Sequence, residues 1–147
     1  MARYFGHVIG ITPVLANDNY ALEAAASESG RITEVRFSSN STGGGGTSMA
    51  TQVSRTNGAG SVPVAGNVQK RHPNSPPNVI TFVASWTGQP TLDAGALLAE
   101  QWVSAGGVVR WLAGPDEEWI ILGAEQISCR NTTGTVASTY RAVWDED

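Results

Sequence analysis

The side chains best suited to chemistry are few in this chain and lie far apart. The two histidines, His7 and His72, are isolated, and neither belongs to the His-x-His or His-Glu-x-x-His patterns that metal sites favour. No serine lies in the Gly-x-Ser-x-Gly pattern of serine hydrolases. We therefore predict no enzyme activity, no cofactor and no metal. A small hydrolase stays open as an alternative that requires His7 or His72 to meet a carboxylate and a nucleophile in one pocket.

Cys129 is the only cysteine, so neither a disulfide nor a thiolate metal cluster can form within one chain. Its flanks, Ile127 and Arg130, are typical of a strand, and a free cysteine in a strand is usually a small buried hydrophobe. The acidic residues lie mostly in turns or at the end of the chain, and we predict that they are solvated rather than paired across a cleft. They include Asp93, Asp116, Glu117 and the tail Asp145-Glu146-Asp147.

A contiguous basic cluster, Lys70-Arg71-His72, stands in a chain whose net charge is −4. It is either a solvated run of charge or a contact for an acidic patch on a partner, and the sequence alone does not separate the two. A net negative charge argues against a general nucleic-acid binder, which needs a basic face. No apolar run approaches the roughly 18 residues that span a bilayer, so we predict no membrane contact, and no signal peptide is recognised.

The five tryptophans each fall in a predicted strand. Core or inter-subunit packing is the simplest interpretation, but exposed aromatic rings also bind sugars and anchor protein interfaces. Trp111 and Trp119 flank the Gly114-Pro115 turn and are the best candidates for an exposed pair. We therefore add them to the candidate interface residues.

The elements that must position these residues are strands. Glycine is abundant, with 17 copies, and turn residues divide the chain into short segments of alternating polarity. In residues 31–37, Val35 and Phe37 share one face, whereas Glu34 and Arg36 share the other. In the last segment, Tyr140, Ala142 and Trp144 share a face opposite Thr139 and Arg141. Further strands are predicted at residues 4–11, 49–55, 79–86, 96–103, 107–113, 118–122, 124–130 and 135–144, and residues 20–26 are a short strand or an irregular link.

At 147 residues the chain fits one domain, and turn signals every 8 to 12 residues indicate an all-β antiparallel sandwich. We predict an N-terminal arm or strand over residues 1–18 and a long Pro/Gly-rich insertion, an extended loop, over residues 56–78. The Gly-rich run within residues 38–48 is predicted to be a loop between strands, because no helix or lysine follows it to form a phosphate site.

The order of these segments resembles that of short tailed-phage capsid decoration (cement) proteins. The similarity covers the chain from about Asn19 onward. It is carried by the opening "YALEAAASESGRITEVRFSSNS", the Pro/Gly insertion before "VITFVASW", the block "LLAEQWVSAGGVVRWLAGPDEEWIIL" and the closing strand "TVASTYRAVWDE". The resemblance implies a jelly-roll or related β-sandwich that binds the major capsid protein on the capsid exterior, after synthesis in the host cytoplasm, and that self-associates as a dimer or trimer. It implies no catalytic residue.

Under this resemblance, the segments that contact capsid subunits are the N-terminal one around Arg3 and Tyr4 and the insertion around Lys70, Arg71 and His72. The alternative is a receptor- or glycan-binding module of a head fibre or tail, which exposed Trp111 and Trp119 would favour.

Overall fold

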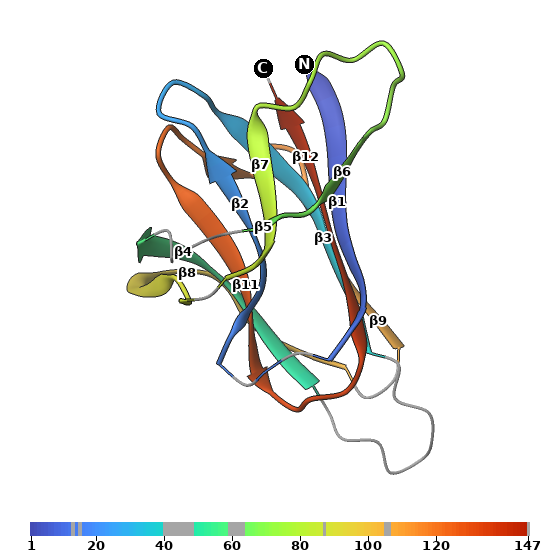
Figure 1. Ribbon diagram of the computed structural model, residues 1–147, viewed down its shortest axis with the longest axis vertical. Helices are drawn as coiled ribbons and strands as arrows, with labels where there is room; N and C mark the ends of the chain where they lie inside the picture. Colours follow the sequence, from blue (N-terminus) through green and yellow to red (C-terminus); the bar gives the residue numbers. More distant parts are fainter. Residues whose placement is uncertain are drawn as a thin grey trace.

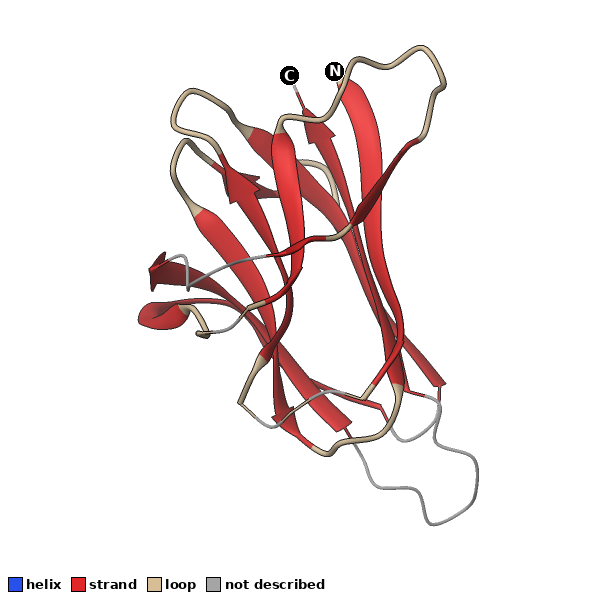
Figure 2. Ribbon diagram, in the orientation of Figure 1, coloured by secondary structure: helices blue, strands red, loops and turns tan. Residues whose placement is uncertain are grey.

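The computed structural model describes residues 1–12, 14, 16–39, 49–58, 64–86, 88–104 and 107–146. Within these ranges all regular structure is β-strand, and the strands form two antiparallel sheets packed face to face (Figure 1, Figure 2). The predicted all-β sandwich is therefore confirmed. In this part of the chain, no helix has the length and apolar character needed to cross a membrane. The predicted Gly-rich loop at residues 40–48 lies outside the described residues.

Each sheet contains six strands. Sheet A consists of β1 (Ala2–Ile11), β3 (Gly30–Ser39), β6 (Asn67–Lys70), β9 (Gly107–Leu112), β10 (Trp119–Ile121) and β12 (Ser138–Glu146). Sheet B consists of β2 (Asp18–Ala24), β4 (Met49–Gly58), β5 (Val64–Ala65), β7 (Ile80–Ser85), β8 (Thr91–Ser104) and β11 (Gln126–Thr133). The strand orders are β10-β3-β12-β1-β6, with β9 also on β3, and β5-β7-β2-β11-β4-β8.

The main strands pair in a nested way along the chain. β1 pairs with β12, β2 with β11, β3 with β9 and β10, and β4 with β8. Successive strands from β1 to β4 also alternate between the sheets. The chain thus behaves as one long hairpin folded over on itself, with β5, β6 and β7 added at one side of both sheets.

Of the two alternatives for residues 1–18, an arm or a strand, the structure has a strand over Ala2–Ile11, in which Tyr4 to His7 pair with β12 on one side and with β6 on the other. The prediction for residues 56–78 needs correction. The predicted loop over residues 56–78 contains the end of β4 and the short strands β5 and β6, and β6 extends sheet A. Of residues 20–26, left between a strand and an irregular link, residues 20–24 belong to β2, a buried strand of sheet B, and residues 25–26 follow it.

The core follows the period-two alternation of the strands. Val35 and Phe37 are buried, whereas Arg36 is exposed, as the sequence pattern predicts. On β12, Tyr140, Ala142 and Trp144 are fully buried, as the same pattern predicts for them.

A chain of aromatic rings fills the space between the sheets. Phe37 stacks on Tyr140 at 5.3 Å between ring centroids, and Tyr20 stacks on Phe82 at 5.1 Å. Phe82 and Trp144 are parallel within 2° at 6.4 Å. The Phe82 ring occupies the space beside Gly6, where a Cβ atom would overlap it. Gly6 is therefore a packing requirement of β1.

The acidic end of the chain is buried, contrary to the prediction that it is solvated. Asp145 and Glu146 are only 6% and 4% exposed. The Glu146 carboxylate accepts hydrogen bonds from the backbone N–H groups of Val79 and Ile80 and from the indole N–H of Trp144, at 2.8 to 2.9 Å. Glu146 therefore joins the end of sheet A to the start of β7 in sheet B. Asp147 lies outside the described residues.

Candidate partner-binding surface

The strands of sheet A carry most of the positive charge of the chain, and most of these side chains point to the outer face; Lys70, opposite the buried Tyr4, is the exception. Of the nine lysines and arginines, all but Arg55 and Arg130 lie on strands of sheet A or directly after β6. The seven are Arg3, Arg31, Arg36, Lys70, Arg71, Arg110 and Arg141. The net charge of −4 thus conceals a basic face, which the charge argument from the sequence did not anticipate.

The predicted basic residues gather at one end of this face, beside the chain termini. Tyr4 pairs with Lys70 across the β1–β6 ladder, and the backbone N–H of Arg71 donates to the carbonyl of Arg3 at 3.0 Å. The loop that follows β6 rises beside the N terminus in Figure 1. The exposed side chains of Arg3, Lys70, Arg71 and His72 therefore share one region, which we call the terminal basic cluster.

Within this cluster the side chains are held by the local structure. Arg3 donates two hydrogen bonds of 2.6 Å to the Asp145 carboxylate, and these bonds raise the pKa of the guanidinium. The Lys70 ammonium donates to the Ser75 carbonyl at 2.7 Å, closing the loop after β6. Lys70 has no acidic partner among the described residues.

Tyr4, which we predicted as an interface residue, has a buried side chain. Its side chain is 0% exposed, and its hydroxyl donates to the carbonyl of Pro76 at 2.8 Å. Its ring stacks on Trp144 at 6.1 Å. Tyr4 therefore anchors the loop after β6 to the core and supports the terminal basic cluster from below.

Trp111 and Trp119 form a pair, but not an outward one. Trp111 is opposite Val35 and Trp119 opposite Ile32 on the shared neighbour β3, so both rings lie on the side of the core. The two rings stack on each other at 3.8 Å with an angle of 9°, and both are partly buried against the core. Since each ring covers one face of the other, the pair makes a poor platform for a sugar and instead joins β9 to β10 across the turn at residues 113–118.

A row of basic residues crosses the middle of the same outer face. The strand register places Arg110, Arg36, Arg141 and His7 opposite one another on β9, β3, β12 and β1. Arg110 is neutralised by two hydrogen bonds of 3.0 Å to Glu34. The Arg141 guanidinium lies 4.7 Å from the centroid of the Phe5 ring, a cation–π contact.

Sequence reasoning placed Arg36 and Arg141 on outward faces but did not recognise the row. The alternation of each strand was visible in the sequence, whereas the register that brings three arginines and His7 into line depends on pairing between segments far apart in the chain. The structure supplies that register.

Two titratable groups inside the sandwich, Cys129 and Asp18, have pKa values raised by burial. Cys129 is 0% exposed, and burial raises the pKa of its thiol far above the usual range, so the thiolate is not available and the interpretation as a small buried hydrophobe is confirmed. Burial also raises the pKa of Asp18, although its hydrogen bond of 2.6 Å from Arg130 acts in the opposite direction. The described residues contain no group of three or more His, Cys, Asp or Glu side chains that could hold a metal ion.

Comparison of the chain with protein-family models, with curated proteins and with solved structures found no match.

Proposed function

We propose that this chain is a non-catalytic structural protein of a phage virion that binds the exterior of the capsid through the outer face of sheet A. The observation that carries the proposal is that seven of the nine basic residues lie on strands of sheet A or directly after β6, all but Lys70 towards the outer face, in a chain whose net charge is −4. Such a face is complementary to an acidic protein surface, and charge complementarity of this kind gives specificity and a fast association rate.

The scaffold supports this proposal. A protein that only has to hold a lattice requires a rigid frame, and here two sheets enclose a continuous aromatic core. A jelly-roll topology is part of the proposal, and the nested pairing of β1 with β12, β2 with β11, β3 with β9 and β10, and β4 with β8 supports it. Jelly rolls are common among viral capsid domains.

The test is co-sedimentation of the purified protein with capsids that lack it. We expect the wild-type protein to pellet with the capsids. Gln69→Glu, which adds a negative charge on the β6 strand beside the terminal basic cluster, is expected to weaken binding several-fold. Thr81→Glu adds the same charge to an exposed position of β7 in sheet B and serves as the matched control. Equal losses for both variants, or no pelleting of the wild-type protein, would contradict the proposal.

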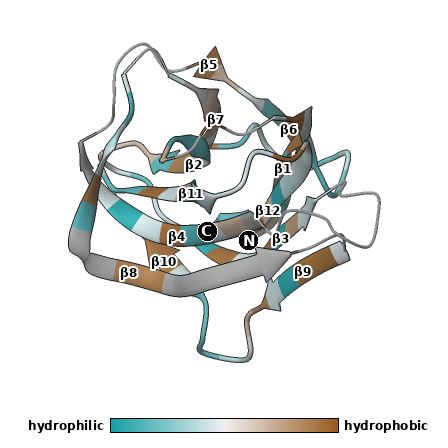
Figure 3. Cartoon of the chain, turned by 90° about the horizontal axis from the view of Figure 1, so that it is seen from below, coloured by the Kyte–Doolittle hydropathy of each residue, from teal (hydrophilic) through white to brown (hydrophobic). Residues whose placement is uncertain are grey.

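Self-association is a second part of the proposal, located at the open edge of sheet A. The edge strands and the residue after β10 expose large apolar side chains, and Figure 3 shows hydrophobic bands on β9 at the rim of the molecule. These side chains are Val108, Leu112, Ile120 and Leu122, at 50 to 58% exposure. An apolar, unpaired edge is a ready site for pairing with another strand, and a second copy of this chain is the occupant that a closed homo-oligomer requires.

Light scattering tests this second part. The wild-type protein is expected to show the mass of a dimer or trimer, and Leu112→Lys is expected to shift it to the monomer mass, because a lysine in the edge opposes pairing. Val64→Lys, at an exposed position of the opposite sheet, is the control. A wild-type monomer at high concentration would overturn self-association and leave the capsid-binding part standing.

A further inference from the structure

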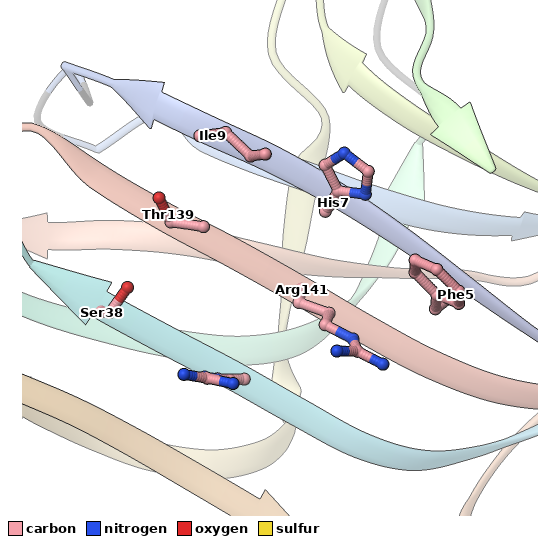
Figure 4. A pocket seen from close by; sticks show the side chains of 7 residues that line it. Phe5, His7, Ile9, Ser38, Thr139 and Arg141 are labelled. Atoms are coloured by element: carbon pink, nitrogen blue, oxygen red, sulfur yellow. The ribbon is translucent and has the colours of Figure 1, made fainter. Parts of the chain in front are cut away.

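A pocket of about 290 Å³ opens on the outer face of sheet A, at the basic row and away from the terminal basic cluster. Figure 4 shows its walls: Phe5, His7 and Ile9 follow one another along β1, and Thr139 and Arg141 lie on the neighbouring strand β12. The seven lining residues are Phe5, His7, Ile9, Arg36, Ser38, Thr139 and Arg141.

The positive charges of this pocket lack acidic partners among the described residues. Arg141 and Arg36 are directly opposite each other on β12 and β3, and like charges in such positions destabilise a sheet. His7 is opposite Arg141 on the other side, on β1. Arg110, the next member of the row, shows the alternative, because Glu34 neutralises it. Within the described part of the chain, no ion pair is found for Arg36 or Arg141. The Nε atom of Arg141 is buried and has no hydrogen-bond partner there.

A buried guanidinium N–H without a partner indicates a missing acceptor, since such groups are normally satisfied. Two guanidinium groups offer planar forks of donors that match a carboxylate. The Ser38 and Thr139 hydroxyls add two neutral donors, and the Thr139 Oγ1 atom itself accepts from the backbone N–H of Gly10 at 3.3 Å. The anionic end of a ligand would therefore lie between β12 and β3.

The remaining wall is apolar. Phe5 and Ile9 line it, and Ile9 is 68% exposed although it is a large hydrophobe. The bulge between Val8 and Ile11, with Gly10 at a φ of 64°, returns Ile11 to the core side and leaves Ile9 on the outer face. A ligand that fits both halves has an aliphatic stem that ends in a single carboxylate, and a multiply charged polyanion is disfavoured by the net charge of −4.

We propose that this pocket binds the side chain of a glutamate from the surface of a partner protein. The methylene groups of that glutamate contact Phe5 and Ile9, and its carboxylate accepts hydrogen bonds from Arg36 and Arg141. The inference deepens the proposed function, on which it rests for the identity of the partner as a capsid subunit. The chemistry of the pocket is testable without the capsid.

The first experiment is an NMR titration of the isotope-labelled full chain with a capped pentapeptide, Gly-Gly-Glu-Gly-Gly. The amide signals of residues 5–9, 36–38 and 139–141 are expected to shift, with a dissociation constant in the millimolar range, as suits one side chain. The same peptide with glutamine in place of glutamate is expected to bind at least fivefold more weakly. Arg36→Gln is expected to cause a similar loss, whereas Arg71→Gln, which removes the same charge at the other end of the face, is expected to stay within twofold.

Three results would overturn the proposal. Equal binding of the glutamate and glutamine peptides would show that charge recognition is absent. Equal losses for Arg36→Gln and Arg71→Gln would show a general attraction to the basic face rather than a site. Binding of glucuronate or inorganic phosphate at least tenfold tighter than the peptide would assign the pocket to an acidic sugar or a phosphate group.

The second experiment repeats the capsid co-sedimentation with Arg36→Gln, and it separates this inference from the proposed function. A tenfold or greater loss of capsid binding supports the pocket as a capsid contact. Wild-type binding by Arg36→Gln overturns the pocket as a capsid contact and leaves the proposed function standing. If the wild-type protein itself does not bind capsids, the proposed function fails, and the peptide titration still decides whether the pocket takes a glutamate.

Discussion

Arg130 on sheet B and Arg36 on sheet A differ in their partners. On sheet B, Arg130 donates to the Asp18 carboxylate at 2.6 Å and to the carbonyl of Pro90 at 2.7 Å. Its neighbours on that face are covered as well, since Ser54 and Ser128 are 2% and 0% exposed. On sheet A, Arg36 is exposed and has no acidic partner among the described residues.

This difference concerns the two arginines and not every polar group of the two sheets. Arg130 is held by groups of its own chain, whereas other buried polar atoms of sheet B, such as Ser128 Oγ, have no hydrogen-bond partner among the described residues. Sheet A leaves like charges opposite one another, an arrangement that costs stability in the free protein. The outer face of sheet A is therefore the better candidate for binding a partner, because a partner could supply the missing negative charge.

The largest loss in the free energy of unfolding is expected for Arg130→Gln on sheet B. The Asp18 side chain is 0% exposed, so removal of Arg130 leaves a buried carboxylate without its counter-charge. We expect a loss of about 3 to 5 kcal/mol in the free energy of unfolding at pH 7. Urea denaturation measures it.

The same variant has a predicted pH dependence. Burial raises the pKa of Asp18 in the wild-type protein, and the loss of Arg130 raises this pKa further. The cost of the variant is therefore full above the raised pKa, where Asp18 is ionised, and shrinks as the pH falls below it, where protonated Asp18 needs no counter-charge. If Arg130→Gln lowered the free energy of unfolding as much at pH 4 as at pH 7, the cost would not come from the unpaired Asp18 carboxylate.

A substitution on the inner side of β1 is expected to lower the free energy of unfolding almost as much, although the outer side of β1 belongs to the basic outer face of sheet A. Gly6→Ala places a Cβ atom on the Phe82 ring, and we expect a loss of about 3 kcal/mol from overpacking. Gly10→Ala on the same strand meets open space and is expected to cost about 1 kcal/mol, because Gly10 has a positive φ. Thermal unfolding of both variants gives the comparison, and equal losses would show that contact with Phe82 is not the cause.

Much of the fold was predictable because local alternation reports burial directly. The pattern of residues 31–37 assigned Val35 and Phe37 to the core and Arg36 to the surface, and the pattern around Tyr140 did the same for β12. Burial of Asp145 and Glu146 was not predictable, because their partners, Arg3 and the backbone at Val79 and Ile80, come from distant segments.

The candidate surface was predictable only where its residues are contiguous. Lys70, Arg71 and His72 stood out as a run, and the structure joins them to Arg3 through the β1–β6 ladder. The pocket on sheet A has no run, because Arg36 and Arg141 each sit singly in a strand. Only the pairing of β3 with β12 brings them together.

The core between the two sheets contains three buried groups that make the free energy of unfolding depend on pH. Burial raises the pKa values of Tyr20, Cys129 and Tyr140 above their ordinary values, 9.0 for the thiol and 10.0 for the phenols. In the unfolded chain these groups lose protons near their ordinary pKa values, whereas the folded protein keeps them. Stability is therefore full below about pH 9 and falls as the pH rises above it, by about 1.4 kcal/mol per pH unit for each group that titrates.

Urea denaturation between pH 7 and 10.5 measures this slope. Cys129→Ala is expected to lower stability at pH 7 and to remove the part of the slope that begins near pH 9, leaving the part due to the tyrosines. An unchanged slope in Cys129→Ala would show that the thiol is not held neutral by the fold. Because these groups lie in the core that both sheets share, the change in the free energy of unfolding with pH is expected to be the same in variants of either sheet's outer face.

The smallest change in the free energy of unfolding is expected for a substitution on the outer face of sheet A, and its sign shows whether the arginines there repel each other. Arg36→Gln removes one of the like charges that face each other across β3 and β12, and no ion pair among the described residues is lost. We expect a change within about 0.5 kcal/mol, towards greater stability at low salt and towards zero at high salt, where the repulsion is screened. Urea denaturation at 20 mM and 500 mM sodium chloride measures both values. A loss of 1 kcal/mol or more would mean that Arg36 already has a favourable partner within the chain. Arg36 and Arg130 would then not differ in the way proposed.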